Sequence, residues 1–423
     1  MLKRVRTSAV VLGCLVLVGL LLAACGGGGT SSGGTAESET GGGELKTASS
    51  GGQPTVQLAT ELPVTGQEVK FPEMASGMEA AMEAINAEGG VNGDQLSLNV
   101  CDTKYSANGE VDCARQIAAE EPAAVVAPFI VADSSGAAWP IFEKAGLPAI
   151  GSQGATLAEL NSPNAFLISS GFVGPYAGTV NAVEAAGGAK KVTVVTDDPD
   201  PVAKPVDAII EGQLKSHGFT EVESVTAHTQ SDPTYATAVA EVLKGNPEAI
   251  IMVASPTDSG TLLQGLSASG YEGIIVNAAL ILTQQVIEGI GAPAEGVYLT
   301  NEHAFISDEK NPGIAKFKED MAKYQPEAAV NDVSLQGWSG MMLFAEAAKG
   351  AKAMESKALM EAFEAVKKPI ELKTVGPWSV VGKLNQIPGF SRIVNPTIDI
   401  GVVENGEVIA KTGFINPFAP PAK

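Results

Sequence analysis

Short β-rich runs alternate with helical segments from residue 55 onward, and this alternation constrains the fold more than any other feature. The runs cover residues 55–59, 95–101, 123–127, 147–150 and 165–168 in a first series, and 191–197, 221–226, 249–253, 273–277 and 296–300 in a second. Strands that alternate with helices form βαβ units and a parallel sheet. Runs such as Ala-Ile-Ile-Met-Val at 249–253 are apolar on both faces, as a sheet covered on both sides requires. The two series predict an α/β protein with two doubly wound, parallel-sheet lobes.

The helical segments and the end of the chain set the predicted domain boundaries. Helices are expected at 68–88, 108–120, 134–145, 202–217, 233–244, 258–269, 283–290, 312–324, 333–348 and 356–366, and a strand-rich stretch at 376–413. If the last three helices return to the first lobe, lobe 1 comprises 54–170 and 301–375, and lobe 2 comprises 171–300. The chain then crosses between the lobes near 169–172, near 300–304 and in the tail (376–423), which predicts a three-strand hinge.

The N-terminus has the pattern of a secretory signal at residues 1–24. Three basic residues at positions 3, 4 and 6 precede an apolar stretch at 9–22 that is too short to span a bilayer comfortably. The sequence Leu-Ala-Ala-Cys that ends at Cys25 resembles the lipobox of bacterial lipoproteins, which implies a lipidated Cys25. The following segment, almost entirely Gly, Ser, Thr, Ala and Glu, is expected to be a disordered tether that completes 25–53. The protein is therefore expected on the extracytoplasmic face of a membrane, held there only by lipid.

The charge of the chain excludes some partners. The formal net charge is −21, and it becomes about −24 when the three basic residues of the signal are removed. Such a surface repels nucleic acid and anionic lipid headgroups, so neither is an expected partner. No apolar run after the signal is long enough for a transmembrane helix.

Two of the four cysteines are expected to form a disulfide. Cys14 lies in the signal and Cys25 is the expected lipid site, which leaves Cys101 and Cys113. In an oxidising exterior two such cysteines are expected to pair. A metal site or a redox pair fits less well, because no His is nearby and the spacing is not Cys-x-x-Cys. We therefore predict a structural disulfide and no metal site.

Three segments resemble the branched-chain amino acid-binding family. They are Ala-Ile-Asn-Ala-Glu-Gly-Gly-Val-Asn-Gly at 84–93, Gly-Ser-Gln-Gly-Ala-Thr at 151–156 and the tail from Gly-Pro-Trp at 376–378 to Asn-Pro at 395–396. Their order and spacing extend the resemblance over nearly all of 54–413. The resemblance implies the type I periplasmic-binding fold, whose lobes close on a ligand by a hinge motion. It also implies a monomer without a cofactor that delivers its solute to an ABC permease and its ATPases.

The first lobe supplies most of the candidate ligand-binding residues. In open parallel sheets, ligands bind outside the carboxyl ends of the strands, where helix N-termini present free N–H groups. The loop 127–136 leaves a buried strand, and Ser134 and Ser135 could either meet a polar ligand group or cap the next helix. Gly154, Ala155 and Thr156 resemble the family segment that holds the main-chain polar groups of the ligand, although Thr156 could instead cap a helix.

A further first-lobe candidate is aromatic. Phe71 precedes the first helix, and the resemblance implies that an aromatic residue at this position contacts the ligand. The alternative is that Phe71 simply packs in the hydrophobic core.

The second lobe departs from the family pattern. Ala279 aligns with the acidic residue that pairs with the ammonium group in amino acid binders. Asp198, in an acidic cluster after the first strand of this lobe, could hold a cation or could simply be solvated. Ser255 and Thr257 are the expected polar contacts from this lobe. An α-amino acid ligand is therefore in doubt, and a neutral, amide-like or apolar-tailed solute is equally compatible with the sequence.

No motif in the sequence indicates an enzyme. There is no Gly-x-Ser-x-Gly, P-loop or Gly-x-Gly-x-x-Gly motif, and the three histidines are scattered. We therefore predict no catalytic residue and a small-molecule binding function. Two alternatives remain open, a sensor that signals to a membrane receptor and a lipid-anchored hydrolase with a site assembled from distant residues.

Overall fold

A computed structural model describes residues 46–47, 55–66, 70–133, 135–197, 203–227, 235–279 and 281–420. All of them belong to one compact unit, Gly42–Lys423. The predicted signal, Cys25 and most of the tether lie outside the described residues, as do Ser134 and Asp198. No helix in the described part of the chain is both long and apolar enough to span a bilayer.

The first sheet has six strands in the order β1-β3-β2-β4-β5-β6. Its strands are β1 (Lys46–Thr47), β2 (Thr55–Leu62), β3 (Gln95–Asp102), β4 (Ala124–Val126), β5 (Ala149–Ser152) and β6 (Ala165–Leu167). The strands from β2 to β6 pair in parallel, and β1 pairs with β3 antiparallel. All three residues of β4 are buried, which explains why this strand is apolar on both faces. Val126 packs in the core beneath α1 (Pro72–Ala87) and α10 (Asp332–Ala348), whereas Val125 packs in the opposite core.

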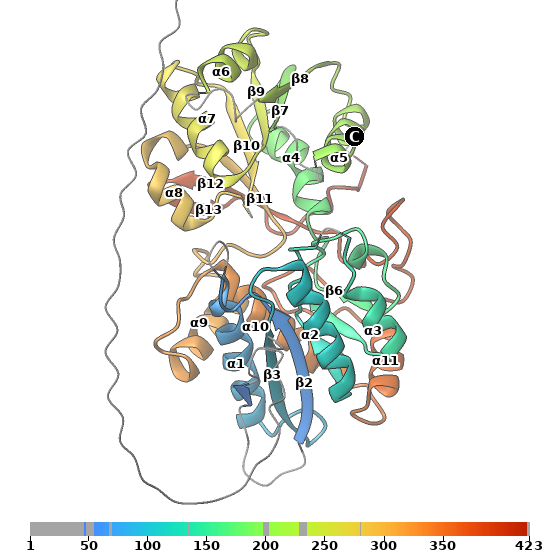
Figure 1. Ribbon diagram of the computed structural model, residues 1–423. Coiled ribbons are helices and arrows are strands. Elements are labelled where there is room, and N and C mark those ends of the chain that lie inside the picture. Colours follow the sequence, from blue (N-terminus) through green and yellow to red (C-terminus); the bar gives the residue numbers. More distant parts are fainter. Residues whose placement is uncertain are drawn as a thin grey trace, which may run out of the picture. The chain divides into compact units, whose positions relative to one another are not determined.

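Both faces of this sheet are covered by helices (Figure 1). α1 and α10 lie on one face together with α9 (Pro312–Tyr324) and α11 (Ser356–Glu364), and α2 (Ala107–Glu120) and α3 (Trp139–Ala145) lie on the other. Glycines allow α1 and α10 to pack closely, because a Cβ at Gly77 would lie 1.9 Å from the Ser334 carbonyl oxygen.

The second sheet has seven strands in the order β13-β12-β11-β10-β9-β7-β8. Its strands are β7 (Lys191–Asp197), β8 (Glu221–Ala227), β9 (Ala249–Val253), β10 (Ile274–Ala278), β11 (Tyr298–Asn301), β12 (Asp399–Glu404) and β13 (Glu407–Ala410). The strands from β7 to β11 are parallel. β12 pairs antiparallel with β11, and β13 pairs antiparallel with β12. One face carries α4 (Val173–Ala185) and α5 (Ala203–Ser216). The other carries α6 (Ala236–Leu243), α7 (Pro256–Ala268) and α8 (Gln284–Ile290). The prediction of two α/β lobes with parallel sheets is confirmed.

The described chain passes between the two sheets three times. It leaves β6 for α4, leaves β11 for α9, and returns from the first lobe into β12. At the second passage the Ala304 amide donates to the Thr374 carbonyl of the first lobe (2.8 Å), while Phe305 packs in the core of the second lobe.

Two sequence-based expectations about secondary structure are wrong. The helix expected at 134–145 begins at Trp139, because Gly136 has a positive φ of 64° and Asp133 accepts hydrogen bonds from the Ser135 and Ala137 amides instead of entering a helix. The strand-rich stretch expected from 376 contains only isolated bridges before β12 begins at Asp399. That stretch is held by side chains instead, including the Trp378 indole, which donates to the Leu167 carbonyl (2.7 Å).

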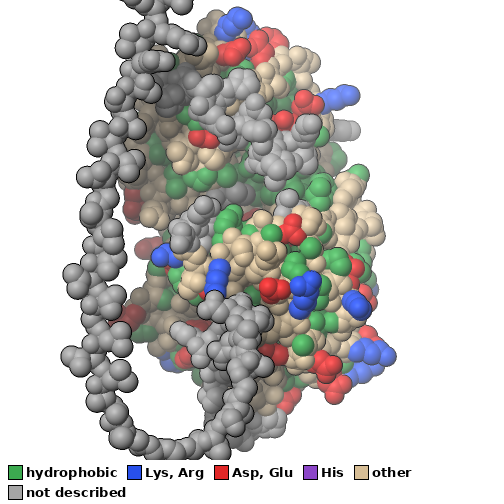
Figure 2. Space-filling view, viewed as in Figure 1, with side chains coloured by type: hydrophobic (Ala, Val, Ile, Leu, Met, Phe, Trp, Pro, Cys, Tyr) green, Lys and Arg blue, Asp and Glu red, His purple; other side chains and the backbone are tan. Residues whose placement is uncertain are grey.

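Cys101 at the end of β3 and Cys113 in α2 form the expected disulfide, with Cα atoms 5.7 Å apart. The bond fastens α2 to the sheet beside the loop after β4. On the face of the molecule shown in Figure 2, acidic and basic side chains are interspersed.

Candidate functional site

The loops after β2 and β4 meet through an aromatic pair. The rings of Phe71 and Phe129 pack edge to face with centroids 5.3 Å apart, and both side chains are half-buried. The Phe129 amide also donates to the Glu61 carbonyl at the end of β2 (3.0 Å). These contacts place an aromatic wall at the carboxyl ends of the strands, where Phe71 was expected.

The backbone amides of the loop after β4 are bound by a carboxylate of the protein itself. Glu110, in the first turn of α2, accepts from the amides of Val131 (2.7 Å), Ala132 (2.7 Å) and Asp133 (2.9 Å). The Glu110 side chain is buried, which raises its pKa, while these three hydrogen bonds act in the opposite direction. The loop after β4, which was predicted to supply amides for ligand binding, therefore has three of its amides bound to Glu110.

Asp133 organises the exposed end of the same loop. Its carboxylate accepts from the Ser135 amide (2.9 Å) and the Ser135 hydroxyl (2.6 Å), and these bonds lower the pKa of Asp133. Ser135 is exposed, and its hydroxyl is engaged in this turn. Ser135 does not cap the next helix, whose N-cap is Ala138, and its hydroxyl instead donates to Asp133 within the turn.

A second buried carboxyl group binds the loop after β5. Glu159 accepts from the amides of Gly154 (2.7 Å) and Ala155 (2.8 Å), and its own amide donates to the Thr156 hydroxyl (3.2 Å). Burial raises the pKa of Glu159 to about 7. Gly154 has a positive φ of 72°, and a Cβ there would lie 2.8 Å from the Cα of Gly171. The Thr156 hydroxyl accepts from the first residue of the short 3-10 helix Glu159–Asn161, although the N-cap of that helix is Ala158.

The loops after β4 and β5 lie against each other. A Cβ added at Gly136 would be 3.1 Å from the Thr156 hydroxyl oxygen. The structure thus brings the turns around Gly136 and Thr156 together, and the loop that contains Gly136 also carries Phe129 of the aromatic pair. Sequence reasoning placed these loops at the strand ends correctly but did not identify Glu110 and Glu159.

A third buried carboxyl group joins two of the crossing segments. Glu302, directly after β11, accepts from the hydroxyl of Ser169, which follows β6 (2.8 Å). Burial, together with the charge of Glu159, raises the pKa of Glu302 to about 7. His303 beside it is buried, and desolvation lowers its pKa to about 3. At neutral pH this histidine is therefore uncharged and does not neutralise Glu302.

The second lobe places Ser255 and Ala279 at the ends of the neighbouring strands β9 and β10. Ser255 is the N-cap of α7 and accepts from the Asp258 amide (3.2 Å), and Thr257 is exposed in the first turn of the same helix. Ala279 is half-buried, and its amide donates to the Thr300 carbonyl (2.9 Å).

A small cavity of about 30 Å³ lies beside Ala279, where the two lobes meet. It is also lined by Asn301 at the end of β11 and by Asp332 at the start of α10, which belongs to the first lobe. Burial raises the pKa of Asp332 to about 6. Residues from both lobes therefore meet next to the position that the sequence singled out.

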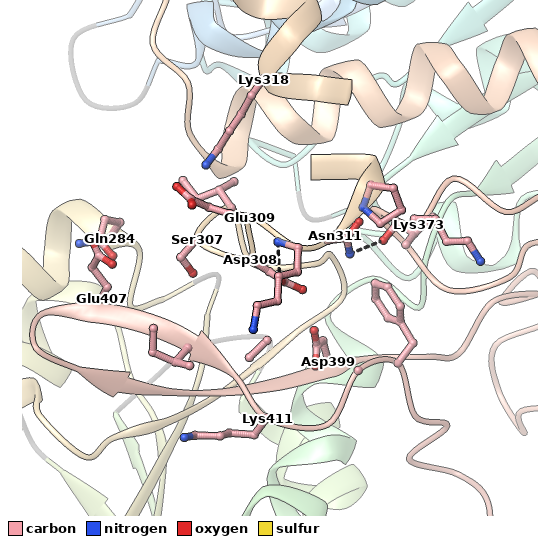
Figure 3. Close-up of a pocket in the computed structure, with 18 of the residues that line it drawn as sticks. Gln284, Ser307, Asp308, Glu309, Asn311, Lys318, Lys373, Asp399, Glu407 and Lys411 are labelled. Carbon is pink, nitrogen blue, oxygen red and sulfur yellow. Dashed lines mark hydrogen bonds between the residues drawn. The ribbon is translucent and has the colours of Figure 1, made fainter. Parts of the chain in front are cut away.

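A wider groove of about 1390 Å³ lies beside the second crossing segment. Figure 3 shows Lys318 of α9 above Glu309, and Lys411 and Glu407 on the β12–β13 hairpin opposite. Its walls are mixed in charge, and none of the sequence-predicted binding residues that the structure describes lines it. Among the described residues no group of three or more His, Cys, Asp or Glu side chains is arranged to hold a metal ion.

Comparisons with known proteins agree with this architecture. A leucine-, isoleucine-, valine-, threonine- and alanine-binding protein of Pseudomonas aeruginosa is 23% identical over 318 residues, which cover 74% of this chain and 82% of that protein. A leucine-binding protein from Thermotoga maritima superposes with a TM-score of 0.65 at 22% identity, over 86% of this chain and 99% of that one. A fatty acid ABC transporter substrate-binding protein from Thermomonospora curvata gives a TM-score of 0.68 at 16% identity, over 86% and 92% of the two chains.

The family profile described as periplasmic binding protein matches residues 56–394, which is most of the chain. The match includes the strands from β2 to β11 and all the strand-end loops described above. Two parallel-sheet lobes joined by three crossing segments are the type I form of this fold. The chain therefore belongs to the periplasmic binding proteins, a family of binding proteins rather than of enzymes.

Proposed function

We propose that this chain is the extracytoplasmic solute-binding component of an ABC importer. It captures one small molecule between its lobes and delivers it to the permease and ATPases. The observation that carries the proposal is the family match over 56–394 together with loops from two parallel sheets, which present aromatic and polar side chains at their strand ends. The names of its relatives, which include amino acid and fatty acid binders, support a small organic solute.

Ligand-dependent stabilisation tests this function. A solute that binds only the folded protein at 100 times its dissociation constant adds about 2.7 kcal/mol to the free energy of unfolding, which raises the melting temperature by several degrees. The panel contains amino acids, amides, sugars and fatty acids. We expect a saturable increase in melting temperature with at least one of these classes, and recovery of the solute chemically unchanged. Turnover of the bound compound would contradict the proposal and favour a hydrolase.

The membrane attachment forms part of the proposal. Cys25 would carry a lipid, and the segment up to residue 53 would act as a tether that leaves the lobes free to meet the permease. Changing Cys25→Ser should move the protein from the membrane fraction to the released fraction of cells that express it. A Cys25→Ser protein that remains with the membrane would contradict the lipid anchor.

A further inference from the structure

We propose that the solute of this protein is uncharged where it meets the first lobe, and that it is an amide or a related neutral carbonyl compound rather than a carboxylate. The inference rests on the proposed function and names the chemical class of the ligand. It depends on which hydrogen-bond donors and acceptors in the loops after β4 and β5 already have partners within the protein.

Five backbone donors of these two loops already bind carboxyl groups of the protein. Free N–H groups at the start of a helix or in a tight loop are the usual partners of a ligand carboxylate. In the loop after β4, three consecutive amides donate to Glu110, and in the loop after β5 two consecutive amides donate to Glu159. The side chains of both glutamates are about 1% exposed, so a ligand carboxylate would have to displace a buried carboxyl group of the protein.

The charges around these loops also oppose an anionic ligand. The loops after β4, β5, β9 and β10 contain no Lys or Arg. Lys70 and Lys104, in the loops after β2 and β3, are exposed to solvent. Asp133 has a lowered pKa and is therefore ionised at neutral pH in the loop after β4. A carboxylate that approached this loop would be repelled by Asp133 without a nearby cation to compensate.

Several buried side-chain atoms near these loops have no hydrogen-bond partner among the described residues, and one of them is an amide oxygen. Gln153 precedes Gly154 and is 5% exposed, and its Nε2 donates to the Gly151 carbonyl (3.3 Å). Its Oε1 is buried without a hydrogen-bond partner among the described residues, and an unpaired buried acceptor is costly. An N–H of a ligand amide would satisfy such an acceptor, whereas a carboxylate would place a second acceptor beside it.

The remaining surface of the first lobe suits an apolar group. Phe71 and Phe129 form an edge-to-face pair at the strand ends, and both are half-buried, so part of each ring is available for contact. Aromatic rings of this kind bind apolar or planar ligand groups without requiring charge. The combination of an aromatic wall, occupied amide donors and an unpaired acceptor fits a neutral amide with an apolar substituent.

Matched pairs of compounds test the proposal. Isothermal titration of the purified full-length protein with isobutyramide and isobutyrate, benzamide and benzoate, and leucine compares ligands that differ mainly in the anionic group. We expect any ligand found in this set to be an amide, bound at least about tenfold more tightly than its acid. A carboxylate or leucine that binds as tightly as, or more tightly than, every amide overturns the proposal.

A second experiment decides the case in which no compound of the set binds. A small-molecule extract of cells is passed over an anion exchanger at a pH of about 11, where amino acids have lost the ammonium proton and are retained with other acids. We expect the unretained fraction to raise the melting temperature of the protein. Stabilisation by the retained fraction alone overturns the inference but leaves solute binding intact. Stabilisation by neither fraction refutes solute binding itself, and the inference falls with it.

Discussion

The buried carboxyl group of Glu302 should make the stability of this protein fall as the pH rises through neutrality. Its pKa is raised from 4.5 to about 7 by burial and by the charge of Glu159, while Ser169 supplies one opposing hydrogen bond. The folded state therefore holds the proton more tightly than the unfolded state. The resulting stabilisation is fully present below about pH 4.5 and is lost as the pH passes 7. At 1.36 kcal/mol per pKa unit, a shift of this size corresponds to about 3 kcal/mol.

The variant Glu302→Gln isolates this effect. Gln cannot ionise and still offers an oxygen to the Ser169 hydroxyl, so the variant should match the wild type at low pH. At about pH 8 it should exceed the wild type by about 3 kcal/mol in the free energy of unfolding, because the buried charge is absent. Urea unfolding between about pH 4.5 and 8 measures the difference.

The matched control is Glu371→Gln. The Glu371 side chain is 47% exposed and pairs with Lys373 at the surface. Its removal should leave the pH dependence of stability unchanged. Parallel curves of stability against pH for the wild type and Glu302→Gln would refute the reasoning, since the buried charge would then cost nothing.

Three further changes have defined outcomes. Gly154→Ala should lower the free energy of unfolding by about 1–3 kcal/mol or more, because a Cβ meets backbone at 2.8 Å. The control Gly146→Ala has the same sign of φ but open space, so an equal loss in both, measured by urea unfolding, would exclude the clash. Replacing Cys101 and Cys113 by Ser should cost about 3 kcal/mol for a loop of this length, and unchanged stability under oxidising conditions would contradict a structural role. Glu110→Ala should cost about 1–3 kcal/mol by leaving three amides without an acceptor, and added acetate should raise the melting temperature of the variant more than that of the wild type. Equal responses to acetate would contradict the carboxylate-filled loop.

The order of strands and helices could be predicted from the sequence because it depends on local periodicity. The helix at Pro312–Tyr324 agrees with its predicted bounds, and β9 matches the expected run at 249–253. The Cys101–Cys113 disulfide also followed from cysteine number and cellular context. The helix and the strand need only the pattern within one segment, whereas the disulfide needs the cysteine count of the whole chain.

The chemistry of the candidate site could not be predicted in the same way. Glu110 and Glu159 lie in short helical segments, where acidic residues are usually exposed to solvent. Only the tertiary fold places their carboxyl groups against loop amides. Glu302 and Ser169 are 133 residues apart in the chain, and their hydrogen bond depends on how the crossing segments meet. The irregular stretch before β12 was also unpredictable, because long-range side-chain bonds such as that of Trp378 hold it in place.

The three passages of the chain between the sheets also affect how the protein folds. The helix α10 packs against α1 but follows it in the sequence by about 250 residues. The second sheet is complete only when β12 and β13, near the C-terminus, have been synthesised. Neither lobe is encoded by a continuous stretch, so neither core is complete before its C-terminal segments have been synthesised. Contacts between residues so far apart in sequence carry a large loop-closure entropy and slow the search for the native state. A nascent chain of this protein should therefore expose part of both cores until nearly its last residue has been added, which prolongs the period in which it can aggregate.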